Sequence, residues 1–90
     1  MLTVLEQNRF KREVRRLARR GKNLSKLDEV VKMLANEEQL PEQYRDHALR
    51  GEWEGFRDCH IEPDWLLIYR IENEKLILVL VATGSHSDLF

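Results

Sequence analysis

Apolar residues in the first forty positions recur with the period of an α-helix. Residues 7–20 carry apolar side chains at i, i+4, i+7 and i+8, namely Phe10, Val14, Leu17 and Ala18. This spacing places them on one stripe of an amphipathic helix. Residues 24–38 carry a second stripe, and only residues 21–23 separate the two segments. The pattern predicts two helices that form an antiparallel hairpin, preceded by a short edge strand at residues 2–5.

Both predicted helices have residues typical of helix ends. Gly21 follows the first stripe and can adopt the left-handed conformation that ends many helices. Ser25 and Asp28 have the spacing of an N-terminal capping box. We therefore expect the second helix to begin close to Ser25.

The period changes to that of β-strands in the second half of the chain. Residues 55–61 and 65–71 are predicted strands, and Asn73-Glu74 favours a tight turn into a third strand at residues 75–82. This third segment lacks polar alternation, so we expect the most central strand here, buried on both faces. Gly84 should end the sheet and release a polar tail.

These elements predict a single domain over residues 1–90 of the α+β class. Short links join the three strands into an antiparallel meander, which the N-terminal strand extends and the helical hairpin covers. Residues 39–52 show no period and are expected to form a long loop. No apolar run approaches the ~20 residues of a membrane span, and the lone Cys59 excludes a disulfide framework. We expect a soluble, cytoplasmic domain.

Positive charge is concentrated in the first predicted helix and the turn after it. Residues 9–26 hold nine bases and one acid, although the whole chain has a net charge of −1. Like charges at helical spacing repel each other, and an external anion would relieve that repulsion. The pattern favours a binding face for nucleic acid or for an acidic protein segment. A solvated helix face is the alternative.

The three histidines are candidates for catalysis. Strand alternation predicts one face that contains Phe56, Asp58, His60 and Glu62. The meander brings His60, Asp64 and His86 to one rim of the sheet, and the long loop allows His47 to reach it. Imidazoles beside a carboxylate suit acid–base chemistry, for which RNA is a natural substrate because its 2′-hydroxyl must lose a proton as the 5′-oxygen gains one. Unconnected structural histidines and a His/Asp zinc site are the alternatives.

Three segments carry longer motifs: Tyr44-Arg-Asp-His-Ala-Leu-Arg-Gly, Trp53-Glu-Gly-Phe-Arg-Asp-Cys-His-Ile-Glu-Pro-Asp-Trp-Leu-Leu-Ile-Tyr and Thr83-Gly-Ser-His-Ser-Asp-Leu-Phe. In this combination the chain closely resembles the YafQ branch of the RelE/ParE superfamily of bacterial type II toxins, over nearly its whole length. The resemblance implies a RelE-like fold and a ribosome-dependent mRNA endonuclease that needs no cofactor or metal. It also implies a cognate antitoxin as partner, besides ribosomal RNA and mRNA.

The resemblance also implies residue roles. It assigns catalysis to His47, His60, Asp64 and His86, and aromatic contacts with RNA to Trp65 and Phe90. Asp64, His47 and His86 are the expected proton carriers, while packing in the core is the alternative role for either aromatic residue. On the basic helix, the expected RNA contacts are Arg12, Arg16, Arg19 and Arg20. Cys59, Tyr69 and residues 76–81 are expected in the core.

Ala82 departs from the family pattern, in which an arginine that binds the scissile phosphate commonly precedes the T-G-x-H segment. Loss of such a cation would cost ~2–4 kcal/mol of transition-state stabilisation. Either Ala82 is an engineered substitution that attenuates the toxin, or this branch uses another cation, with Arg57, Arg50 and Arg70 as candidates. A non-nucleolytic toxin of the gyrase-poisoning ParE type and a catalytically dead antitoxin-binding module are the alternative functions.

Overall fold

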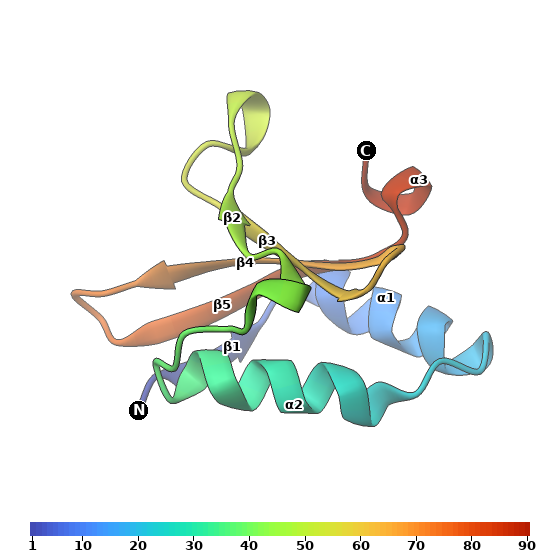
Figure 1. Ribbon diagram of the computed structural model, residues 1–90, viewed down its shortest axis with the longest axis horizontal. Coiled ribbons are helices and arrows are strands. Elements are labelled where there is room, and N and C mark those ends of the chain that lie inside the picture. Colours follow the sequence, from blue (N-terminus) through green and yellow to red (C-terminus); the bar gives the residue numbers. More distant parts are fainter.

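The two amphipathic stripes form helices α1 (Asn8–Arg19) and α2 (Leu24–Ala35) in the computed structural model, which describes residues 1–90 (Figure 1). The chain reverses at Gly21, whose φ of +83° confirms the predicted left-handed conformation. The predicted Ser25 cap is wrong, because the side-chain oxygen of Asn23 accepts the Ser25 N–H and starts the helix. The helix also ends before residue 38, since Glu37 adopts a φ of +60°.

Five strands form one sheet in the order β1-β5-β4-β3-β2. Their bounds are β1 Thr3–Glu6, β2 His47–Ala48, β3 Arg57–Glu62, β4 Trp65–Glu72 and β5 Ile77–Gly84. The predicted antiparallel meander of β3, β4 and β5 is confirmed, and β1 pairs in parallel with β5 at one edge. The other edge strand, β2, lies in the segment expected to be a loop, between 3₁₀ turns at Glu42–Tyr44 and Gly51–Trp53.

The third meander strand differs from its prediction in two ways. β5 is buried along both faces as expected, but β4 occupies the centre of the sheet. The link between β4 and β5 is also longer than two residues, because Leu76 still belongs to the turn and donates its N–H to the Asn73 carbonyl. Leu76 has a φ of +56° and is 57% exposed, so its predicted place in the core is wrong. Cys59 and Tyr69 are buried as predicted.

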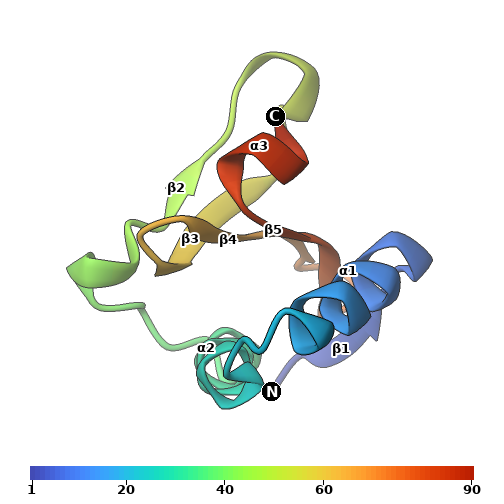
Figure 2. The ribbon, with the colours of Figure 1, turned by 90° about the vertical axis from the view of Figure 1, so that its right-hand side faces the viewer.

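The sheet separates two apolar clusters. Both helices cover one face and enclose the larger cluster, which includes Phe10, Leu17 and Val30 (Figure 2). The smaller cluster lies on the other face, beneath the segment that follows β2 and the C-terminal segment, and consists of Leu66, Ile68, Val79, Val81, Ala82 and Leu89. No helix is long and apolar enough to cross a membrane.

The C-terminal tail is folded, contrary to expectation. Residues His86–Leu89 form a helical turn, α3, whose Leu89 is buried in the smaller cluster. Ser85 caps this turn: its hydroxyl accepts the Asp88 N–H, and the Asp88 carboxylate accepts the Ser85 N–H. The capping box that the sequence suggested at Ser25 therefore occurs at Ser85, where it fixes the start of α3.

Candidate active site

Asp64 and His86 form a pair on the rim predicted from the meander. Asp64, in the β3–β4 turn, accepts the backbone N–H of His86 at 3.0 Å and lies 2.9 Å from its Nδ1. These two bonds, the backbone one first, hold the pKa of Asp64 below its ordinary value. Because a carboxylate only accepts hydrogen bonds, Nδ1 of His86 carries a proton, and Nε2 presents a lone pair when the ring is neutral.

His60 lies beside this pair. Its ring centroid is 5.6 Å from that of His86, in an edge-to-face arrangement. Its Nδ1 lies 3.2 Å from the carbonyl oxygen of Pro63, which can only accept. The turn between β3 and β4 thus orients both His60 and, through Asp64, His86.

His47 approaches from the edge strand. Strand β2 pairs His47 with Asp58 of β3, and so fixes a residue that was expected in a loop. Its Nδ1 lies 2.7 Å from the Arg45 carbonyl oxygen and 3.2 Å from Oδ1 of Asp58. All three imidazoles therefore have an acceptor at Nδ1, whereas none of their Nε2 atoms bonds to another residue.

Asp58 is a candidate functional residue that the sequence did not single out. It is 4% exposed, and burial raises the pKa of its carboxyl, while the nearby charges of His47, His60 and His86 act in the opposite direction. Its Oδ1 makes no well-directed hydrogen bond. The sequence did contain one indication of this position, because Asp58 and His60 are two residues apart in a predicted strand and so share one face.

Glu62 is not on the predicted face. The register of β3 against β4 shifts between His60 and Glu62, and this irregularity breaks the alternation. The Glu62 carboxylate instead binds Lys22 at 3.0 Å and Lys26 at 2.8 Å, on the helical side of the sheet. The hydrogen bonds from Lys26 and Lys22 hold its pKa below the ordinary value.

The two predicted aromatic contacts differ in exposure. Phe90 is 58% exposed and lies 6.4 Å from the His86 ring, between centroids. Trp65 is 1% exposed, and its Nε1 donates to the Thr83 hydroxyl at 3.0 Å. This burial, with Lys22 Nζ 5.7 Å from the ring centre, favours the alternative role of Trp65 in packing over the expected RNA contact.

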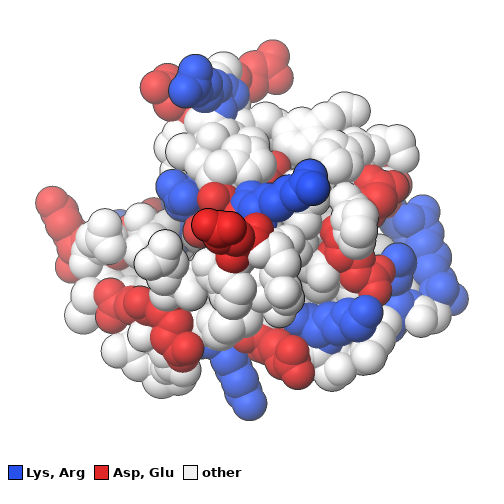
Figure 3. Space-filling view, viewed as in Figure 1, with Lys and Arg blue, Asp and Glu red and all other residues white.

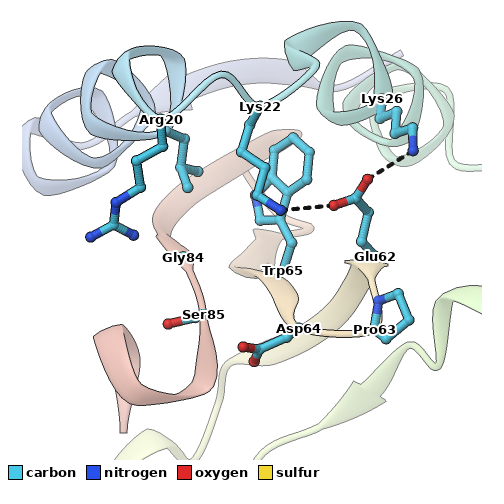
Figure 4. Close-up of a pocket in the computed structure, with 10 residues that line it drawn as sticks. Arg20, Lys22, Lys26, Glu62, Pro63, Asp64, Trp65, Gly84 and Ser85 are labelled. Atoms are coloured by element: carbon cyan, nitrogen blue, oxygen red, sulfur yellow. Dashed lines mark hydrogen bonds and ion pairs between the residues drawn. The ribbon is translucent and has the colours of Figure 1, made fainter.

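A pocket of about 470 Å³ separates the helical hairpin from the β3–β4 turn (Figure 4). Arg20, Lys22 and Lys26 line its helical side, opposite Glu62 and Asp64. The basic segment is thus partly neutralised within the fold, since Asp88 also lies 3.9 Å from Arg16 and 3.2 Å from Arg20.

Other bases of the segment are not neutralised in this way. Arg12 and Arg19 are exposed and make no ion pair. Lys and Arg side chains gather near α1, at the right of Figure 3. The positive charge without a nearby carboxylate therefore covers a smaller area than the whole of residues 9–26.

Ala82 lies on the same face of the sheet as the imidazoles, within the smaller apolar cluster, and has no exposed surface. Of the cations suggested in its place, Arg57 alternates with Asp58 along β3 and binds Asp46 at 3.3 Å, and Arg70 binds Glu72 at 3.1 Å. Arg50 is exposed and has no ion pair. No three His, Cys, Asp or Glu side chains are grouped as metal ligands.

Comparisons with known proteins agree on one family. Residues 2–90 match the family described as "Bacterial toxin of type II toxin-antitoxin system, YafQ". The mRNA interferase toxin YafQ of Escherichia coli K12 is 39% identical, over 90% of this chain and 87% of that protein. The putative toxin YafQ of Haemophilus influenzae is 46% identical, over 97% of this chain and 90% of that protein.

Solved structures give the same result. A metal-bound toxin from Helicobacter pylori has a TM-score of 0.95 and 42% identity, with 100% of both chains covered. The E. coli DinJ–YafQ complex has a TM-score of 0.91 and 35% identity, with 100% of this chain and 99% of that chain covered. The RelE-like α+β fold expected from the sequence is confirmed.

Proposed function

The chain belongs to the YafQ family of bacterial type II toxins, and we propose that it is an mRNA interferase that cleaves ribosome-bound mRNA by acid–base catalysis without a metal. The arrangement of the three histidines supports this proposal most directly. Each imidazole is anchored through Nδ1, and each Nε2 is available to a substrate. A surface that only binds a partner has no need of three imidazoles oriented in this way.

In the proposed reaction, one Nε2 removes the proton of an RNA 2′-hydroxyl, and the 2′-oxygen attacks the adjacent phosphorus. The bond from phosphorus to the 5′-oxygen breaks, and a second, protonated imidazole gives that oxygen its proton. The products are a 2′,3′-cyclic phosphate and a free 5′-hydroxyl. Such transfers contribute about 10²–10⁴-fold each to a rate. His86 is one of the two proton carriers, since Asp64 fixes its tautomer.

Asp64 has a positioning role in this scheme. A carboxyl whose pKa is held below its ordinary value stays ionised near neutral pH and is a poor proton donor. Its two bonds to His86 instead hold the ring in place. Asp58 helps to position His47, since its Oδ1 lies 3.2 Å from Nδ1 of that ring.

Phe90 and the exposed arginines are proposed to bind RNA. The exposed ring of Phe90 can stack on a nucleobase beside His86, an interaction worth ~1–3 kcal/mol. Arg12 and Arg19 can bind phosphates of ribosomal RNA directly, and Arg16 and Arg20 can do so when Asp88 releases them. A cognate antitoxin that covers the same charges would silence the toxin, and the E. coli relative was solved in a complex with DinJ.

Individual replacement of the three histidines tests the proposal. His47→Ala, His60→Ala and His86→Ala should each lower mRNA cleavage in a translating bacterial extract by about 10²–10⁴-fold. Lys75→Gln, in the turn between β4 and β5, is the control. Wild-type cleavage should persist in EDTA when polyamines keep the ribosomes intact. Undiminished cleavage by all three variants would overturn the site, and loss in EDTA would favour a metal-dependent nuclease.

A gyrase assay distinguishes the rival functions. Inhibition of DNA supercoiling without RNA cleavage would indicate a toxin of the ParE type. Binding to the antitoxin without either activity would indicate a catalytically dead module. Ala82, at the position where the family commonly has arginine, is the feature that favours this alternative.

A further inference from the structure

The proposed site lacks a permanent cation next to its imidazoles. Position 82 holds a buried alanine, Arg57 alternates with Asp58 and so lies on the opposite face of β3, and Arg70 binds Glu72 through both Nε and a terminal nitrogen. A transition state with extra negative charge on the phosphate is stabilised by a cation in its immediate surroundings. An active site at this rim needs such a cation, and the arginines that remain are Arg50, which is exposed without an ion pair, and Arg9, which lies next to the aromatic rings beside His86.

Arg9, near the start of α1, reaches this region. Its guanidinium carbon lies 5.8 Å from the centre of the Trp53 ring. Trp53 in turn lies 6.2 Å from Phe90, and Phe90 lies 6.4 Å from His86, between ring centroids. A row of two aromatic rings thus connects Arg9 with His86.

Glu13 anchors Arg9 next to position 82. The Glu13 side chain is 7% exposed; its Oε2 binds Nε of Arg9 at 3.3 Å, and its Oε1 accepts the Thr83 N–H at 3.1 Å. Thr83 directly follows Ala82 in β5. One buried carboxylate therefore connects the Arg9 side chain with the strand end at which the family commonly has its arginine.

The free edge of Arg9 suits a phosphate. Its side chain is 39% exposed, and only Nε is bound, so that both terminal nitrogens have no partner in the fold. Arginine binds phosphate oxygens in a bidentate manner through such a pair of N–H groups. A guanidinium held by a carboxylate and by an aromatic face also loses less side-chain freedom when it binds.

We infer that Arg9 supplies the phosphate-binding cation that Ala82 does not, and that it contacts the RNA phosphate beside Phe90 and His86. This inference rests on the proposed nuclease function. It makes Arg9 part of the reacting site, in contrast to the arginines further along α1, which contribute to binding of the ribosome. It also accounts for an active site with alanine at position 82.

The test measures single-turnover cleavage of ribosome-bound mRNA at increasing concentrations of toxin. Arg9→Gln should lower the maximal rate about 100-fold, with little change in the half-saturating concentration. Arg9→Lys, which keeps the charge, should be less impaired than Arg9→Gln. Lys32→Gln, on α2, should behave as the wild type.

Because Arg9→Gln leaves Glu13 without its cation, the double variant Arg9→Gln/Glu13→Gln is measured too. The amide oxygen introduced at position 13 can still accept the Thr83 N–H, so this variant should fold and show the same loss of rate. An unchanged maximal rate in either variant, or a change in half-saturation alone, would overturn the inference. If the wild type itself does not cleave, the proposed function fails, whatever the Arg9 variants do.

Discussion

The carboxylate of Asp64 holds His86 by two hydrogen bonds, from the backbone N–H at 3.0 Å and with Nδ1 at 2.9 Å. It thereby joins the β3–β4 turn to the first residue of α3, across the rim of the sheet. Since Asp64 stays ionised, it keeps the proton of His86 on Nδ1 and leaves Nε2 for the substrate.

Asp64→Asn should lower the cleavage rate by about two to four orders of magnitude. An asparagine amide can donate to Nδ1 of His86, which would move the ring proton to Nε2 and remove the base. The rate is measured in a translating extract, with Asp28→Asn on the exposed side of α2 as a control of the same charge change. A rate within experimental error of the wild type would contradict the positioning role.

The two aromatic residues at the rim should respond differently to substitution. Trp65→Phe removes the hydrogen bond to Thr83 and should lower the free energy of unfolding by about 1–2 kcal/mol, with unchanged half-saturation by ribosomes. Phe90→Ala should weaken RNA binding by ~1–3 kcal/mol and change stability little. Thermal melts and cleavage titrations separate the two effects. Weaker ribosome binding by Trp65→Phe would instead indicate that Trp65 contacts RNA, despite its burial.

Ala82→Arg should not improve the toxin. Position 82 has no exposed surface within an apolar cluster, so an arginine there brings a charge and extra volume into the core. We expect a loss of about 2 kcal/mol or more in the free energy of unfolding, and no gain in cleavage. Ala82→Met adds length without charge and shows how much of the loss is due to volume. Faster cleavage by a stable Ala82→Arg protein would indicate that Ala82 attenuates the natural activity.

Asp88 should make stability dependent on pH. The Ser85 N–H, then the Ser85 hydroxyl and Arg20, hold the Asp88 pKa below its ordinary value of 3.8. A carboxyl with a lowered folded-state pKa stabilises the fold above its ordinary pKa, and this contribution disappears as the pH falls through the folded-state pKa. Asp88→Asn should therefore melt below the wild type at neutral pH, and the difference should shrink on acidification. A difference independent of pH would contradict this assignment.

Strong periodicity explains why so much of the fold could be predicted. The stripes of α1 and α2 and the meander of β3, β4 and β5 span enough residues to show their period. The meander alone brought Asp64 and His86 together, because antiparallel strands return to the same rim.

Features that depend on single contacts were not predictable. Strand β2 consists of His47 and Ala48, too few residues to show alternation, and its pairing with β3 depends on the tertiary fold. The irregularity after His60 turns Glu62 toward Lys22 and Lys26, although nothing in the local sequence marks it. The burial of Asp58 next to the imidazoles also depends on the tertiary fold, and the local sequence does not indicate it.

Primer extension in a bacterial extract, with and without active translation, maps the cleavage sites and tests the nuclease function most directly. The wild type should cut mRNA within the translated region only when ribosomes are translating, and His86→Gln should leave the mRNA intact while it still folds. No cut by the wild type, or equal cutting by His86→Gln, would rule out cleavage through His86.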